Sequence, residues 1–187
     1  MADIGKTVRT ATAADATAVQ AIYAPVVRDT AISFEEEEPS VPEMARRIAA
    51  TLETYPFLVL EEAGQVLGFA YAGALRVRAA YRWSAEITAY VDARARERGI
   101  GRTLYDALLD TLKRQRFHAA FAGVALPNPA SVGLLKAVGF SHFGTYQEVG
   151  FKFGRWHDVA WWRLPLAAGL PAGEPIPFRD LDAQRPV

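Results

Sequence analysis

The stretch Arg96-Glu97-Arg98-Gly99-Ile100-Gly101 combines positive charge with two glycines directly before a helix-forming segment. The first-turn amides of a helix have no partner within the helix, and the helix dipole favours an anion at that end. The two glycines lack a Cβ, so an anionic group can approach their backbone closely. The two arginines of the stretch and Arg102 add cations around the same point. This pattern predicts a binding site for a phosphate or pyrophosphate group.

The segments on either side of this stretch support the prediction. Residues 83–91 have the composition of a strand, and Leu104, Leu108 and Leu112 follow at helical spacing. A Walker loop does not fit, because it requires a lysine after the last glycine. A dinucleotide-binding fold does not fit either, because an acidic residue should follow about 20 positions later, and position 121 is Phe121. Taken by itself, the motif leaves an ordinary loop that leads into a helix as the alternative.

Hydrophobic periodicity along the whole chain predicts one domain of the α/β or α+β class. The expected order is β-α-α-β-β-β-α-β-α-β-β, which gives a mixed sheet with helices on its faces. Capping patterns at Thr12 and Ser40 open the first two helices, and Pro25 is expected to end or bend the first. Strands are expected at residues 7–11, 57–61, 66–74, 83–91, 119–125, 140–146 and 156–164.

The C-terminal part differs in composition from the rest of the chain. The protein has 187 residues, and residues 1–166 suffice for one domain with its own core. Residues 167–187 are rich in proline and glycine and lack periodicity, which is typical of an extended arm. The acidic run Glu35–Glu38 is interpreted as a solvated face.

Composition and charge exclude several classes of protein. The formal net charge is zero, which argues against nucleic acid as the main partner. There are no cysteines, so disulfides, thiolate zinc sites and a cysteine nucleophile are excluded. No apolar run approaches the roughly 20 residues of a membrane span, so we expect a cytoplasmic protein with no membrane partner. No set of histidines and acids has metal-ligand spacing, so no metal is expected.

Several motifs, in the right order, resemble the GNAT superfamily of acyl-CoA N-acyltransferases over residues 6–164. The Arg/Gln-x-x-Gly-x-Gly/Ala signature of that superfamily is met by Arg96, Gly99 and Gly101. A second motif begins with Asn128-x-x-Ser131 and ends in Gly139-Phe140. Within the superfamily, the chain is similar to the phosphinothricin and methionine sulfoximine N-acetyltransferases. That narrower similarity rests on residues 80–86, 126–128 and 149–159.

The resemblance implies a mostly antiparallel mixed sheet, flanked by helices, whose fourth and fifth strands splay apart to hold acetyl-CoA. The pyrophosphate would lie on the amides of residues 96–101, and the pantetheine arm would follow the edge of the fourth strand. The residues expected to bind the cofactor are Ala89, Tyr90, Val91, Arg96, Glu97, Arg98, Gly99, Ile100, Gly101, Arg102, Asn128 and Ser131.

Amine acetylation requires alignment of the amine, its deprotonation and support of a tetrahedral oxyanion. The resemblance implies that Glu86 is the general base, and the alternative is a surface-facing glutamate on the same strand. The chain departs from the family at Leu135, five residues before the phenylalanine of Gly139-Phe140, where relatives have histidine or tyrosine. Leucine cannot protonate or hydrogen-bond a departing thiolate. The general acid is therefore left open.

The connection before the fourth strand carries arginines that suit a carboxylate. Guanidinium groups bind carboxylates in a bidentate fashion, and the resemblance implies that Arg76 and Arg78 clamp the substrate. Tyr81 and Phe34 are expected as pocket walls, and solvated loop arginines are the alternative interpretation. Lys152 would contact the substrate or stabilise the last strand pair.

These observations predict an acetyl-CoA-dependent N-acetyltransferase for the α-amine of a small amino acid or analogue. One alternative is a peptide N-terminal acetyltransferase, which would need an open groove. The other is a catalytically weak acyl-CoA-binding sensor, which the leucine at position 135 suggests. A homodimer is also expected, with contacts from Trp156, Trp161, Trp162 and the C-terminal arm.

Overall fold

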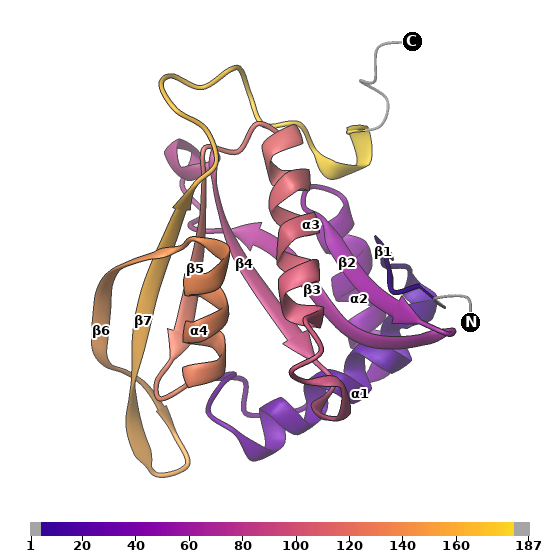
Figure 1. The fold of residues 1–187 in the computed structure, drawn as a ribbon. Coiled ribbons are helices and arrows are strands. Elements are labelled where there is room, and N and C mark those ends of the chain that lie inside the picture. Colours follow the sequence, from indigo (N-terminus) through magenta and orange to yellow (C-terminus); the bar gives the residue numbers. More distant parts are fainter. Residues whose placement is uncertain (1–4, 182–187) are drawn as a thin grey trace.

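A computed structural model describes residues 5–181 of the chain. Its strands form one seven-stranded sheet in the order β1-β2-β3-β4-β5-β7-β6 (Figure 1). The strands are β1 Thr7–Thr10, β2 Phe57–Glu62, β3 Gln65–Ala74, β4 Ser84–Val91, β5 Ala119–Ala125, β6 Ser141–Lys152 and β7 Arg155–Pro165. The helices are α1 Ala16–Asp29, α2 Val41–Leu52, α3 Ile100–Arg114 and α4 Pro129–Val138. This arrangement confirms the predicted mixed α/β fold.

The central strand pair is the irregular one. Every other neighbouring pair is antiparallel, whereas β4 and β5 are parallel and pair only from Ser84↔Ala119 to Glu86↔Phe121. Beyond Glu86 the two strands diverge, so the rest of β4 has a paired neighbour on one side only. The gap opens downward in Figure 1, and the predicted splay between the fourth and fifth strands is confirmed.

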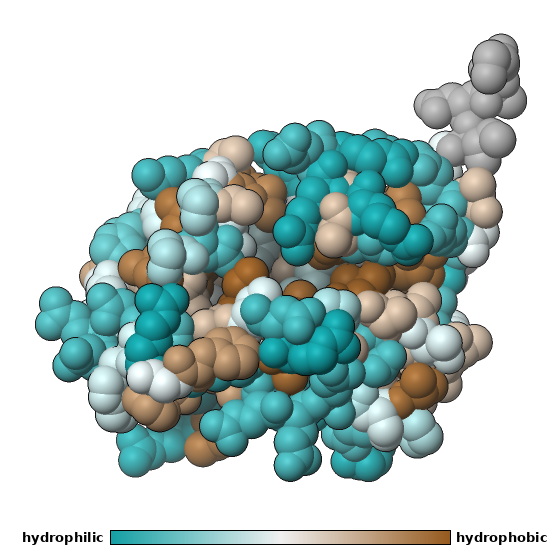
Figure 2. Space-filling model, turned by 90° about the horizontal axis from the view of Figure 1, so that it is seen from below, coloured by the Kyte–Doolittle hydropathy of each residue, from teal (hydrophilic) through white to brown (hydrophobic). Residues whose placement is uncertain are grey.

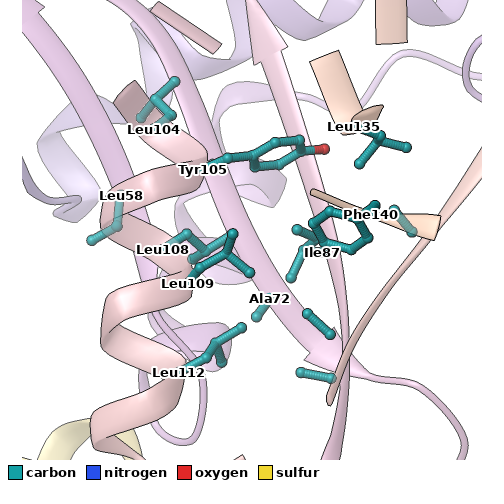
Figure 3. Packing of buried hydrophobic residues seen from close by; sticks show 14 of the residues in the cluster. Leu58, Ala72, Ile87, Leu104, Tyr105, Leu108, Leu109, Leu112, Leu135 and Phe140 are labelled. Carbon is teal, nitrogen blue, oxygen red and sulfur yellow. The ribbon is translucent and has the colours of Figure 1, made fainter. Parts of the chain in front are cut away.

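Helices cover both faces of the sheet and define two hydrophobic cores. On one face α3 and α4 pack over the central strands, and Leu104, Leu108 and Leu112 are fully buried there (Figure 3). On the other face α1 and α2 cover β2 and β3 with a second cluster that includes Phe69. Because strand side chains alternate, consecutive residues of β4 point to different cores. The side chain of Ile87 points to the core under α3.

Two elements extend further than the sequence pattern predicted. Pro25 does not end the first helix, because α1 continues through it to Asp29. The strand expected to end at Tyr146 continues as β6 to Lys152. Its register with β7 shifts between Tyr146 and Gly150, and such an irregularity interrupts the alternation that marks a strand in the sequence.

The segment after β7 packs back onto its own domain. Trp83 Nε1 donates a hydrogen bond to the carbonyl oxygen of Gly173 at 2.9 Å, and Arg82 pairs with Glu174. Ile176 is buried and exchanges hydrogen bonds with Gln115 at the C-terminal end of α3. Residues 182–187 of the predicted arm lie outside the described residues. Within residues 5–181, no helix is long and apolar enough to cross a membrane.

Candidate active site

The glycine stretch forms an open helix N-terminus at the mouth of the gap (Figure 1). Gly99 precedes α3 with a φ of 77°, in the left-handed region that glycine adopts without strain. A glycine at this capping position offers no side-chain acceptor, so the amides of Ile100, Gly101 and Arg102 remain available. Free amides at a helix N-terminus suit a phosphate group, as the sequence predicted.

The arginines around this helix end differ in what they already bind. Arg98 pairs with Glu62 at 2.6 Å, and Arg94 pairs with Asp92 at 2.6 Å. Arg102 pairs with Asp106 and also donates to the carbonyl oxygen of Ala137, which joins α3 to α4. Arg96 forms no hydrogen bond or ion pair with any residue from 5 to 181. It is therefore the arginine of this loop that is most available to an anion.

Gly101 has a packing role that the sequence did not suggest. A Cβ at this position would lie 2.9 Å from Leu134 Cδ2 of α4 and 3.7 Å from Val91. The missing side chain thus lets α3 and α4 approach each other beside the gap. A substitution at Gly101 would therefore disturb the helix pair in addition to the phosphate site.

The residues predicted to lie along the pantetheine arm, Ala89, Tyr90 and Val91, point to two different faces of the sheet. Ala89 and Val91 pack against the core under α3, which leaves their backbone at the open edge of β4. Tyr90 points to the opposite face, where its ring lies 4.9 Å from Tyr23 and 5.3 Å from Phe69. The groups of Tyr90 that face the gap are therefore those of its backbone.

Across the gap, Asn128 and Ser131 open α4. The Asn128 side-chain oxygen accepts a hydrogen bond from the Ser131 amide at 3.1 Å, so Asn128 is the N-cap of this helix. Asn128 is 9% exposed. The pair fixes the start of α4 beside the gap, and the Asn128 amide NH2 group stays unused by the described residues.

Glu86 lies at the point where β4 and β5 separate. It pairs in register with Gly73 of β3, which has no side chain, and with Phe121 of β5. Burial raises the pKa of the Glu86 carboxyl, and the positive charge of Arg76 opposes this only in part. No hydrogen bond to this carboxylate occurs within residues 5–181. A partly desolvated, uncommitted carboxylate of this kind can accept a proton.

Arg76 forms one wall of the site together with a tryptophan. Its guanidinium carbon lies 5.5 Å from the centre of the Trp161 ring, and that ring lies over Gly123 of β5. Of the two neighbouring tryptophans expected at a dimer contact, Trp162 belongs to the core cluster and Trp161 does not. Alternation along β7 could have separated the two, since consecutive strand residues face opposite ways. Arg78 and Tyr81 are exposed on the same β3–β4 connection.

Lys152 stabilises the loop that carries Phe34. The Lys152 ammonium is buried and donates to the carbonyl oxygens of Val27, Ser33 and Glu35 at 2.6, 2.9 and 2.7 Å. Of its two predicted roles, the structural one therefore fits these contacts.

Phe34, on the α1–α2 connection, packs against the hairpin of β6 and β7 and depends on a glycine there. A Cβ on Gly150 would come within 2.2 Å of the Phe34 ring, so only glycine admits it. The ring also lies 6.0 Å from that of His157, whose Nε2 is 3.0 Å from the Lys152 carbonyl oxygen. The hairpin of β6 and β7 thus positions Phe34.

The acidic run is not simply a solvated face. Glu35 accepts hydrogen bonds from both Arg47 and Tyr23. Burial by itself would raise the pKa of Glu35, but these bonds outweigh it and the pKa is lowered. Glu38 pairs with Arg28. Glu35 therefore helps to hold the α1–α2 connection in place, whereas Glu36, Glu37 and Glu38 are exposed, as expected for a solvated face.

A cavity of about 260 Å³ lies between α1, α2 and the face of the sheet that carries Glu86. Its lining includes Tyr71, which pairs in register with Thr88 and whose pKa is raised by burial and also by the Glu86 charge. Arg47 also lines it. Figure 2, seen from below, shows that this end of the molecule is hollowed, with hydrophobic residues inside and hydrophilic residues around the rim. Among residues 5–181, no group of three acids or histidines is arranged to hold a metal ion.

The profile of the GNAT acetyltransferase domain matches residues 8–161. The chain belongs to the GNAT family of acetyltransferases. This GNAT protein is 39% identical to a phosphinothricin N-acetyltransferase of Streptomyces viridochromogenes over 172 residues, which cover 92% of each chain. It is 35% identical to an L-methionine sulfoximine/L-methionine sulfone acetyltransferase of Salmonella typhimurium, over 86% of this chain and 94% of the relative.

A solved structure adds the cofactor. A GNAT phosphinothricin acetyltransferase from Sinorhizobium meliloti, in complex with acetyl-CoA, superposes with a TM-score of 0.85. It is 37% identical, and the match covers 91% of this chain and 93% of that one. The GNAT protein is an acetyltransferase that uses acetyl-CoA. Its open α3 N-terminus, its unpaired Arg96 and the free edge of β4 suit that cofactor.

Proposed function

We propose that the GNAT protein transfers the acetyl group of acetyl-CoA to the α-amine of a small amino acid or amino-acid analogue. Phosphinothricin, methionine sulfoximine and methionine sulfone are the expected types of substrate. The observation that carries this proposal is the position of Glu86, a partly desolvated carboxylate within the electrostatic influence of Arg76, where β4 and β5 separate. The names of the relatives in Streptomyces and Salmonella support the same substrate class.

In the proposed reaction, Glu86 accepts a proton from the substrate ammonium. The freed amine nitrogen attacks the thioester carbonyl carbon, and the carbonyl electron pair moves to oxygen. Amides at the open edge of β4 are suited to donate to that oxyanion. The attacking nitrogen, which is cationic after the bond forms, gives its second proton to solvent. The oxyanion then collapses, the carbon–sulfur bond breaks with its electron pair on sulfur, and the amide product and a thiolate result.

Substrate binding is proposed to rely on charge and on the aromatic walls. Arg76 would bind the substrate carboxylate, with Arg78 next along the connection, and Phe34 and Tyr81 would flank the amino acid. The cavity lined by Tyr71 and Arg47 lies on the face of Glu86 and offers polar groups to the side chain of the substrate. Backbone groups at positions 89–91, the residues of the 96–102 loop, Asn128 and Ser131 are proposed to hold acetyl-CoA.

One assay tests this function. Thiol release is measured with acetyl-CoA and methionine sulfoximine, methionine sulfone, phosphinothricin, or a panel of peptides with free N-termini. Turnover with the free amino-acid analogues supports the proposal. Turnover with peptides alone would favour a peptide N-terminal acetyltransferase. Cofactor binding without turnover on any amine would favour an acyl-CoA-binding sensor.

We further propose that the GNAT protein is a cytoplasmic homodimer, with the hairpin of β6 and β7 as the contact surface. Phe143, Phe151, Phe153 and Trp156 are each more than half exposed on this hairpin. Trp162 and the C-terminal segment, expected at the dimer contact, pack within their own chain. An apolar surface of this kind is typical of an interface between subunits.

A further inference from the structure

The fully buried Leu135 offers no hydrogen-bond donor to the thiolate that leaves in acetyl transfer. Its side chain lies in the core between α3, α4 and β4, together with Phe140 (Figure 3). A thiol has an unperturbed pKa near 8.5, so its anion leaves more readily when a donor stabilises it. A donor would have to come from another element that reaches the same point.

Tyr105 on α3 reaches that point. It lies one helical turn after Gly101, and Figure 3 shows its hydroxyl directed toward Leu135 across the space between α3 and α4. Its side chain belongs to the same core cluster as Leu135 and Ile87, and Tyr105 is 7% exposed. Its hydroxyl forms no hydrogen bond with any residue from 5 to 181. A hydroxyl that is not committed to another residue can donate its proton to a polar group bound beside it.

The position of the reacting sulfur follows from the two points between which the cofactor arm must extend. The pyrophosphate lies at the start of α3, near Val91, and the reacting carbonyl must lie within reach of Glu86. The cofactor arm must therefore pass along β4 from Val91 toward Glu86, a strand length of roughly 17 Å. Ile87, which adjoins Glu86 in β4, packs in the same cluster as Tyr105. The sulfur thus comes to the part of the gap that Tyr105 faces.

We propose that Tyr105 donates, from α3, the hydrogen bond to the leaving thiolate that Leu135 cannot supply from α4. This proposal rests on the proposed function. As the carbon–sulfur bond breaks, its electron pair stays on sulfur, and the Tyr105 O–H bond points to that anion. Burial raises the pKa of the Tyr105 hydroxyl, so the phenol keeps its proton and acts as a hydrogen-bond donor. Solvent protonates the thiolate after it leaves.

The test measures the thiol of bound coenzyme A, so it needs no acceptor amine. Calorimetry first establishes coenzyme A binding to the natural protein and to Tyr105→Phe. The pKa of the bound thiol is then titrated by the ultraviolet absorbance of its thiolate. We expect this pKa to be higher in Tyr105→Phe by about half to one unit, since a hydrogen bond to an anion is lost. Equal pKa values in the two proteins would overturn the proposal.

A matched control and a rescue separate this role from packing. Tyr55→Phe removes another partly buried hydroxyl, one that packs on Phe117 at the far end of α3, and it should leave the thiol pKa unchanged. Leu135→His in the Tyr105→Phe background should return the pKa toward its natural value, because it restores a donor from α4. If the double variant keeps the raised thiol pKa, and Tyr55→Phe raises that pKa by the same amount, the effect is structural only and the proposal is overturned.

The thiol titration also distinguishes a failure of this proposal from a failure of the proposed amine substrate. If coenzyme A binds and its thiol pKa depends on Tyr105, the inference stands even when every amino-acid substrate fails. If coenzyme A binds neither protein, the cofactor site itself is wrong and the inference falls with it. Steady-state kcat for Tyr105→Phe should fall about three- to tenfold at saturating amine, with an unchanged Kd for coenzyme A.

Discussion

At the scale of single residues, the proposed chemistry depends on a carboxylate that the native fold partly removes from water. Because burial raises the pKa of Glu86, its charged form is disfavoured in the folded state. This penalty is fully present above the folded pKa and absent below the unfolded value near 4.3. The same residue therefore lowers stability at neutral pH and is the proposed base.

Glu86→Gln tests both consequences at once. We expect kcat to fall about 10²-fold, the low end for a general base, while the melting temperature at pH 7 rises slightly. In the natural protein, kcat/KM should fall with decreasing pH through a pKa above that of an ordinary glutamate. The Gln variant should not show this decrease. Stopped-flow thiol release across pH and thermal melts measure the two effects. Unchanged turnover in the variant would assign the base to another group.

Arg96 provides a second test at the residue scale, because its neighbours are already paired. Arg96→Ala should weaken acetyl-CoA binding by about tenfold, the value of one charge-assisted hydrogen bond. Arg94→Ala is the matched control, since Arg94 is exposed on the same loop and already pairs with Asp92. Calorimetry of both variants decides the matter. Equal affinities for the two would mean that Arg96 does not bind the phosphates.

At the scale of elements, the buried ammonium of Lys152 joins the β6–β7 hairpin to the α1–α2 connection. Lys152→Met would leave three carbonyl oxygens without their donor. We expect a loss of about 3 kcal/mol in the free energy of unfolding. Lys113→Met, on an exposed face of α3, should change it little. Denaturant titration measures both, and similar stabilities of the two variants would contradict the structural role.

The same variant should affect the substrate site through Phe34. If the loop relaxes, KM for the amine should rise more than Kd for acetyl-CoA, because Phe34 lies on the acceptor side and the phosphate loop is held separately. A parallel rise in both constants would instead indicate general loosening of the fold.

Local elements could be predicted from the sequence because their signals are local. The strand, glycine stretch and helix from Ser84 to Arg114 follow from alternation, capping and period, and the family motifs placed Glu86 within them. What the sequence could not supply were contacts between distant segments. Lys152 reaches carbonyls more than a hundred positions away, and the direction of the Tyr105 hydroxyl depends on how α3 meets α4.

At the scale of the whole molecule, the sheet provides one gap and two flanking cores. The core under α3 and α4 lies on the side proposed for the cofactor, while the opposite core borders the cavity proposed for the amine. Glu86 lies at the branch point of β4 and β5, where the two sides meet. In the proposed reaction, the sheet would thus bring two reactants to one carboxylate from opposite faces. The hairpin of β6 and β7 borders the side proposed for the amine and carries the exposed aromatic surface.

That surface leads to a prediction about assembly. We expect a mass near twice 20.5 kDa by light scattering at micromolar concentration, because burial of the exposed rings would stabilise a pair of subunits. Phe151→Glu, which places a charge beside Trp156 on this hairpin, should produce monomers. Leu170→Glu is the matched control, since Leu170 is 92% exposed on the C-terminal segment and its variant should remain dimeric. A monomeric natural protein would contradict the prediction. Equal dissociation in both variants would place the contact elsewhere than on the hairpin.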